Sequence, residues 1–419
     1  MNSARPPRGG LWQNPDFLKL WSAYSTSVLG AQLASLAYSL TAVITLQATA
    51  FQIGLIAAAG PAASGLVGLF AGVVVDRVRR KPLLIVSDLA RAGLVLTIPA
   101  AYIFGLLRIE QLYVVAFLMG IFSMLADVGI MAYIPALVKR DELIEGNSKF
   151  AATDSVAVIA GTGASGVLVQ ALTAPLAIIV DAVSFILSAL FLWTIRGRET
   201  PPAAVEGPKN IRKDIAEGLS FVYRHRILRP LAEEIALYFF FIYLFIPIFN
   251  LYAIRELGFE PVLLGVVLAA IGVGFMASAL TVKRLTSRFG IGRVMIAGAF
   301  LNIVSIFLMS VRGSTKTVTV VVLIGAHFLL ALGIQAVAIN MMSLRQAITP
   351  DRLQGRMNAS FRFVNVCMMM LGSLTAGALG ETIGLRATLI VSACGMLLPF
   401  LRLMFSPVRN LREQPEAIE

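Results

Sequence analysis

Long apolar runs fill most of the chain and are separated by short polar segments. A helix needs about 20 mainly apolar residues to cross a bilayer, and each run approaches or exceeds that length. Proline and glycine occur inside several runs, and membrane-spanning helices tolerate both residues. The pattern therefore predicts twelve membrane-spanning helices. Their expected bounds are Leu18–Leu46, Phe51–Val75, Leu83–Leu107, Leu112–Val138, Phe150–Leu172, Leu176–Ile195, Leu231–Ala253, Val262–Val282, Val294–Val311, Val318–Leu344, Asn358–Leu379 and Arg386–Phe405.

The longest polar stretch, Arg196 to Pro230, lies between the sixth and seventh runs. Within it, apolar residues recur at helical spacing at Ile211, Ile215, Leu219 and Val222. This spacing predicts a short amphipathic helix, either lying at the membrane surface or serving as a solvated linker. We therefore expect a first six-helix half in residues 1–195, a central loop in 196–230 and a second half in 231–419.

Several short motifs recur about half a chain later. Asp141-Glu142-Leu143 before the fifth run matches Asp351-Arg352-Leu353 before the eleventh at an offset of 210 residues, and Gly166 matches Gly377 at 211. Two related halves around a midplane site are a common plan of secondary transporters. The sequence thus predicts an all-α membrane protein with twelve transmembrane helices in two pseudo-symmetric six-helix halves.

The composition excludes several other classes of protein. Hydrophobic residues make up 58% of the chain and charged residues only 14%, whereas a soluble domain carries about 25% charged residues. The two cysteines, Cys367 and Cys394, stand in apolar runs and do not suggest a disulfide scaffold. The sequence has no phosphate-binding loop, hydrolase triad or metal-ligand spacing, so we expect no enzyme, no cofactor and no metal.

The net charge of +12 reflects membrane topology in this interpretation. A basic chain can signal nucleic-acid binding, but here the charge is one-sided. If the chain starts inside, 29 of the 35 Lys and Arg residues fall on the inner side and five on the outer side, with Arg91 inside a run. Cytoplasmic loops collect positive charge. We therefore expect no nucleic-acid partner, a multi-pass protein of the plasma membrane, and both termini in the cytoplasm.

The segment after the second run, Gly72 to Lys81, places one carboxylate among four cations. Such a cluster can bridge to a neighbouring helix and lock one conformation. The segment resembles the signature loop of the major facilitator superfamily and departs from it at Arg79, where that superfamily has Gly. The matching residues, which we expect to form a gate, are Gly72, Asp76, Arg77, Arg80 and Lys81.

The wider pattern is similar to the drug:proton antiporter branch that includes macrolide efflux proteins and enterobactin exporters. The similar segments cover nearly the whole chain and include Asn14–Trp21, Asp127-Val128, Asn147–Phe150, Asp181–Phe185 and Gly355–Ala359. The antiporter element of the fifth span reads Gly161-Thr162-Gly163-Ala164-Ser165-Gly166 here and lacks its proline.

The resemblance implies a monomeric transporter that works by alternating access and exports amphipathic small molecules in exchange for protons. A siderophore exporter and a lysolipid transporter of the same fold remain open, as does a different class, a membrane receptor or uncoupled pore.

Acidic residues inside predicted spans are costly and are therefore functional candidates. Asp127 lies 11 residues from the inner end of its span, about 16 Å deep at about 1.5 Å per residue. This depth is near the midplane and suits a proton-coupling or cation-recognising carboxylate, with a structural hydrogen bond as the alternative. Asp88, Arg91 and Asp154 are expected to form gating ion pairs.

In superfamily relatives, the first, fourth, seventh and tenth spans line the central pathway. Polar and aromatic side chains of these spans predict a cavity for an amphipathic substrate, although an aromatic residue can equally serve helix packing, and a lone His is often only hydrogen-bonded. The candidates are Tyr24, Ser27, Ser35, Tyr38, Ser123, Tyr243, Asn250, His327 and Gln335.

Overall fold

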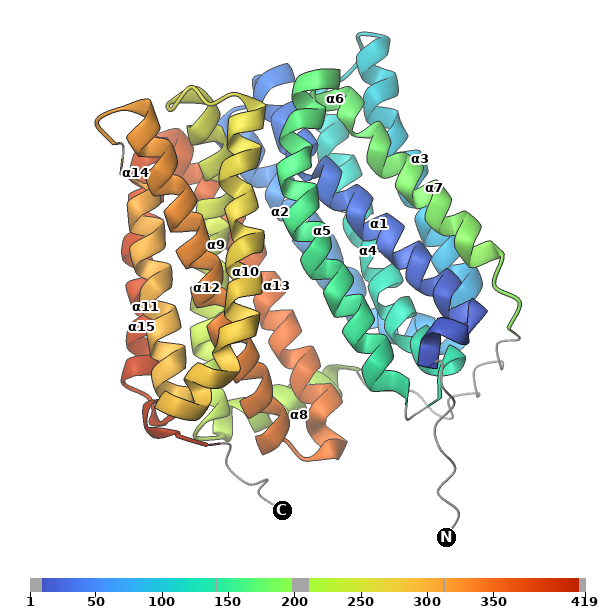
Figure 1. Ribbon diagram of the computed structural model, residues 1–419, viewed down its shortest axis with the longest axis vertical. Coiled ribbons are helices and arrows are strands. Elements are labelled where there is room, and N and C mark those ends of the chain that lie inside the picture. The colour runs from blue at the N-terminus through green and yellow to red at the C-terminus, as the bar shows by residue number, and fades with distance from the viewer. Residues whose placement is uncertain (1–9, 140–141, 198–210, 312, 414–419) are drawn as a thin grey trace.

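The computed structural model describes residues 10–139, 142–197, 211–311 and 313–413, and the regular elements in these ranges are helices. They form twelve segments long and apolar enough to cross a membrane, two of which join consecutive helices (α6 with α7 and α14 with α15), and this confirms the twelve predicted spans. The described chain begins and finishes at one end of the bundle, called the lower end here as it is drawn in Figure 1. The other end is called the upper end.

The first half contains α1 to α7 and the second half α9 to α15 (Figure 1). A π-helical turn, Thr41–Thr45, extends α1, and 3-10 turns lie at Gly10–Gln13 and Pro407–Asn410. The helices are α1 Pro15–Leu40, α2 Ala50–Arg77, α3 Arg80–Ile103, α4 Ile109–Leu137, α5 Leu143–Leu172, α6 Ala174–Ala177, α7 Ile179–Trp193, α8 Ile211–Arg224, α9 Leu228–Arg255, α10 Pro261–Phe289, α11 Ile291–Met309, α12 Lys316–Ile348, α13 Asp351–Thr382, α14 Leu385–Gly395 and α15 Leu397–Met404.

Glycines bring the two halves together in their upper parts. A Cβ on Gly54 of α2 would lie 2.6 Å from the Ser373 carbonyl oxygen and 2.7 Å from the Cα of Gly377 in α13. On α5, a Cβ on Gly166 would lie 3.1 Å from the Cα of Gly265 in α10. Glycine permits such close backbone approach. An offset of 211 residues relates the two crossings, because it links Gly54 to Gly265 and Gly166 to Gly377.

Hydrogen bonds between the halves reinforce the closure of the upper end. Asn250 of α9 donates to the Ser39 hydroxyl at 3.2 Å. Arg255 donates to the Ala48 carbonyl at 2.9 Å. The glycine crossings and these contacts hold the two halves tightly at the upper end.

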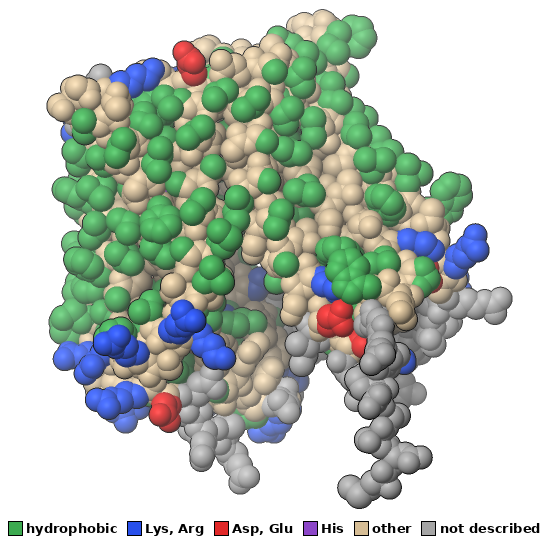
Figure 2. Space-filling model, in the orientation of Figure 1, with side chains coloured by type: hydrophobic (Ala, Val, Ile, Leu, Met, Phe, Trp, Pro, Cys, Tyr) green, Lys and Arg blue, Asp and Glu red, His purple; other side chains and the backbone are tan. Residues whose placement is uncertain are grey.

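The halves separate toward the lower end. Figure 2 shows the surface hollowed between them there. The carboxylates of Asp127 and Asp154 are exposed, although both residues lie within helices of the first half. Together with the sealed upper end, this hollow defines a conformation that is open at the lower end.

The central segment contains the helix α8, and protein contacts hold this helix in place. Its Gly218 lies against α13, where a Cβ would be 2.6 Å from the Arg356 carbonyl oxygen. Glu217 forms an ion pair with Arg356 at 2.7 Å, and Val222 is buried. The helix is therefore packed on the second half.

His225 fixes the turn from α8 into α9. Its Nδ1 accepts the backbone N–H groups of Ile227 at 3.1 Å and Leu228 at 3.2 Å. These are among the backbone donors that a helix start leaves without an intrahelical partner. Burial lowers the pKa of His225, which favours the neutral ring that can accept these bonds.

Candidate transport site

Asp127 faces the second half across the lower hollow. Its Oδ2 lies 3.8 Å from Nη2 of Arg362 on α13, and the two side chains are 60% and 46% exposed. The same Nη2 lies 2.8 Å from the sulfur of Met124. A half-exposed pair of this kind contributes about 0–1 kcal/mol. The contact between α4 and α13 can therefore be broken at little cost.

Arg362 was not among the residues singled out from the sequence, because it was counted with the positive residues of the inner side. On the predicted span, Arg362 lies only four residues after Asn358, near the inner end. The helix α13 begins at Asp351, which places Arg362 11 residues after its first residue.

Tyr24 and Asp154 form a hydrogen-bonded pair between α1 and α5. The Tyr24 hydroxyl donates to Asp154 Oδ1 at 2.6 Å, and its ring lies 4.7 Å from that of Phe150. Asp154 was expected in a gating ion pair, but the ion pairs of the described residues do not include it. Its carboxylate is instead held by a neutral phenol within the first half.

Asp88 and Arg91 form a buried ion pair inside the first half. Their exposed fractions are 3% and 9%. Asp88 also accepts a 2.6 Å hydrogen bond from Ser188 of α7, and the Arg91 guanidinium lies 4.3 Å above the Phe185 ring. The pair therefore fastens α3 to α7 in this conformation.

Tyr38 is turned into the first half. Its hydroxyl donates to Asp181 Oδ2 at 2.6 Å, and Asp181 is 1% exposed. Asp181 lies one turn before Phe185 on α7, and the Arg91 guanidinium lies over the ring of that Phe185. The structure thus gathers two buried carboxylates, Asp88 and Asp181, around one buried cation.

The remaining cavity candidates occupy different surroundings. Ser35 is exposed, Ser27 is buried, and Ser123, Tyr243 and Gln335 are half-buried. Asn250 takes part in the upper closure described above.

His327 belongs to the packed core of the second half. It is 2% exposed, its Nδ1 shares a 2.8 Å hydrogen bond with the Leu323 carbonyl, and its ring lies 5.0 Å from that of Phe249.

The signature loop is described only in part. Gly72, Asp76 and Arg77 lie outside the residues whose side chains the structure describes, so their predicted gate stays a prediction. Arg80 opens α3. The Lys81 ammonium donates to the carbonyls of Trp193 at 2.9 Å and Ile195 at 2.6 Å. A cation at these carbonyls suits the negative end of the α7 dipole.

The start of α9 holds a carboxyl that the sequence pattern did not reveal. Glu233 pairs with Arg229 at 2.8 Å and with Arg402 of α15. Glu234, the next residue of α9, is 3% exposed. Its Oε2 has no hydrogen-bond partner among the described residues. A buried carboxyl without a hydrogen-bond partner is costly, so Glu234 is an unusual feature of the start of α9.

Comparisons with known proteins agree with this geometry. The multidrug efflux pump Tap of Mycolicibacterium fortuitum is 27% identical over 377 residues, which are 87% of this chain and 89% of that protein. A solved mutant of the nucleoside transporter NupG superposes with a TM-score of 0.74 at 14% identity, covering 93% of this chain and 99% of that mutant.

A second solved structure, a bacterial homologue of the iron transporter ferroportin in an inward-facing state, also gives a TM-score of 0.74, at 15% identity. It covers 93% of this chain and 98% of that homologue. Both superpositions confirm the predicted fold. Residues 11–418 match the family described as transmembrane secretion effector, and the chain therefore belongs to this family of major facilitator transporters.

Proposed function

We propose that the protein exports amphipathic small molecules from the cytoplasm in exchange for protons, with Asp127 as the coupling carboxylate. The observation that carries this proposal is the Asp127 side chain, exposed in the lower hollow and 3.8 Å from Arg362 of the other half. In this assignment, both termini and the open end face the cytoplasm of a plasma-membrane protein. The gathering of Lys and Arg near the lower end of the face in Figure 2 supports that orientation.

A carboxylate that binds either a proton or a cation, but not both, can couple the two in antiport. Ionised Asp127 attracts Arg362 or the positive group of a substrate, whereas protonated Asp127 attracts neither strongly. A substrate cation and a proton therefore exclude each other at this position. Release of Arg362 also changes how α4 and α13 meet, which links proton binding to the movement of the halves.

The relative Tap, a multidrug efflux pump, supports export of drug-like molecules. The weak carboxylate–arginine contact supports the same interpretation, because a low-cost contact is easily replaced by a bound substrate. Siderophore or lysolipid export would use the same hollow with a different substrate, and a panel of substrates separates these alternatives.

The test is transport by purified protein in proteoliposomes with an imposed pH gradient, using cationic dyes, a siderophore and a lysolipid. We expect gradient-driven flux of the cationic dyes. Asp127→Asn should abolish the effect of the gradient and leave dye exchange without a gradient. Glu110→Gln is the matched control, because Glu110 is an exposed acid at the upper end of the same helix. Full gradient-driven flux in Asp127→Asn would remove Asp127 from the mechanism.

A further inference from the structure

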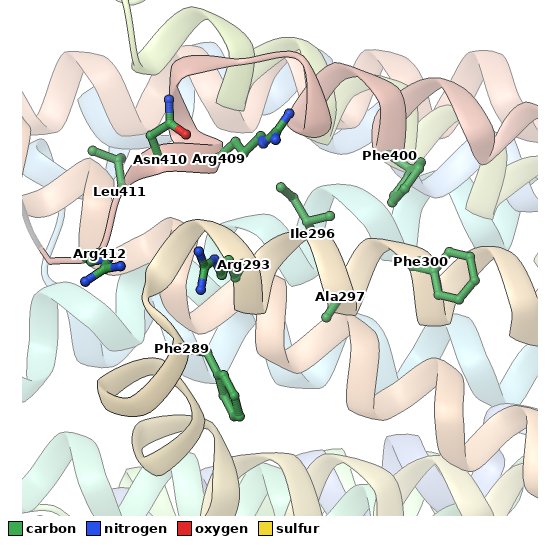
Figure 3. Close-up of a pocket in the computed structure, with 10 residues that line it drawn as sticks. All are labelled: Phe289, Arg293, Ile296, Ala297, Phe300, Phe400, Arg409, Asn410, Leu411 and Arg412. Carbon is green, nitrogen blue, oxygen red and sulfur yellow. The ribbon is translucent and has the colours of Figure 1, made fainter.

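A second cavity lies at the lower end of the second half, apart from the central hollow. Its volume is about 610 Å³. Figure 3 shows that it lies between α11, with the end of α10, and the segment that follows α15. It is lined by Phe289, Arg293, Ile296, Ala297, Phe300, Phe400, Arg409, Asn410, Leu411 and Arg412.

Three arginines make this cavity strongly positive. Arg293, Arg409 and Arg412 are all exposed, and no Asp or Glu is among the lining residues. The ion pairs of the described chain involve none of the three. Three cations brought together without a counter-charge repel one another, and an anion bound between them would relieve that repulsion.

The position of the arginines is fixed by the backbone. Gly292 donates to the Leu411 carbonyl at 2.9 Å, and Ile291 donates to the Arg412 carbonyl at 3.3 Å. A Cβ on Gly292 would lie 2.1 Å from the Val408 carbonyl oxygen, so only glycine permits this approach. The segment after α15 is thus fastened to the first turn of α11, which carries Arg293.

The cavity changes from charged to apolar along α11. Phe300 lies nine residues above Ile291, about 14 Å along the helix axis. Its ring lies 6.0 Å from that of Phe400. Phe289 and Phe300 are 46% and 52% exposed. Charge at the lower end with aromatic surface above it matches a molecule that has an anionic head and an apolar tail.

We propose that this cavity binds an anionic phospholipid of the lower leaflet, with the phosphate held by Arg293, Arg409 and Arg412 and an acyl chain lying along Phe300 and Phe400. Arginine suits phosphate because its planar group presents paired donors. Basic pockets between helices on the cytoplasmic side of membrane proteins bind acidic headgroups by the same physics. The lipid would hold the segment after α15 against α11 and thereby stiffen the lower end of the second half.

The test is native mass spectrometry of the purified full chain with added phosphatidylglycerol, and with phosphatidylcholine of the same acyl chains. We expect tighter binding of phosphatidylglycerol, weakened about fivefold for each arginine replaced in Arg293→Gln, Arg409→Gln and Arg412→Gln. The matched control is Lys283→Gln, Arg284→Gln and Arg352→Gln, which removes the same charge from exposed positions outside the cavity. This control should bind like the parent.

Several results would overturn the proposal. Equal binding of the two lipids by the parent protein would exclude headgroup recognition. An equal loss in both triple variants would show only a general effect of charge. Displacement of phosphatidylglycerol by inorganic phosphate at the same concentration would identify a site for a soluble anion. Circular dichroism of each variant confirms folding, and none of these measurements depends on transport.

Discussion

The glycine crossing between α2 and α13 allows the closure of the upper end to be tested by adding one methyl group. In Gly54→Ala, the new Cβ would lie 2.6 Å from the Ser373 carbonyl oxygen and 2.7 Å from the Gly377 Cα. Carbon atoms prefer separations of about 3.5–4.0 Å, so the two helices must move apart by about 1 Å. Both contacts are with backbone atoms, which cannot rotate away as a side chain can.

The expected effect is a shift between conformations. Overpacking of this kind costs about 1–3 kcal/mol, and the cost falls on the conformation in which α2 and α13 touch at the upper end. The ratio of lower-open to upper-open molecules should therefore fall by about 5- to 150-fold. Adding Gly166→Ala at the second crossing should shift the ratio further, because its Cβ would lie 2.4 Å from the Pro261 carbonyl oxygen.

The assay is a distance measurement between paired spin labels, after both native cysteines have been replaced. The labels occupy exposed positions of opposite halves, with Arg108 and Glu256 for the upper end and Asn147 and Arg284 for the lower end. In Gly54→Ala, the upper distance should lengthen and the lower distance should shorten.

Gly93→Ala is the matched control for the added methyl group. Nothing lies within 4 Å of a Cβ built on Gly93, so its distances should equal those of the parent. If a folded Gly54→Ala/Gly166→Ala protein kept the parent distances at both ends, closure by these crossings would be refuted.

Three further predictions concern stability. Asp88→Ala leaves the buried Arg91 without its carboxylate and should lower the free energy of unfolding by about 3–5 kcal/mol. Replacing both residues by apolar ones should lower it less. Thermal unfolding measures both effects. Gly218→Ala places a methyl group 2.6 Å from the Arg356 carbonyl oxygen and should release α8, detected as faster proteolysis within it. Burial lowers the pKa of His225. The contribution of its neutral ring to the free energy of unfolding should therefore be complete above the ordinary pKa of about 6.5, and it should be lost as the pH falls through the lowered pKa. The variant His225→Asn keeps a hydrogen-bond acceptor but does not titrate. Its free energy of unfolding, measured at a series of pH values, should therefore depend less on pH in this acid range.

The membrane spans could be predicted because the bilayer selects for long apolar runs. Their ends could not be predicted, because hydropathy detects only the apolar part of a helix. The helix α13 begins at Asp351 and not at the expected Asn358, and α12 continues to Ile348 beyond the expected Leu344. Backbone hydrogen bonds continue past the apolar part, where side chains such as Arg352 are exposed.

The direction in which a single side chain points was harder to predict than the depth of its residue in the membrane. The predicted face of the first span, formed by Tyr24, Ser27, Ala31, Ser35 and Tyr38, repeats on average every 3.5 residues, but a straight helix has 3.6 residues per turn. This face therefore drifts by about 20° per heptad, or about 40° over its length. This drift is consistent with the different partners of its two ends, since Tyr24 bonds to Asp154 of α5 and Tyr38 to Asp181 of α7.

The two halves share a fold but not a distribution of charge. The 211-residue offset links Asp127 to Ala338 and Asp181 to Ser392, so neither acid has a charged counterpart. Ser392 nevertheless donates to the Phe241 carbonyl at 2.7 Å, joining α14 to α9 as Asp181 joins α7 to α1. The packing role is thus filled by a neutral group in the second half. Because an acidic residue buried in a membrane is costly, the use of Asp181 where the second half has Ser392 indicates a function beyond packing. In the proposed mechanism, the first half binds the proton at Asp127, and Arg362 of the second half responds to it.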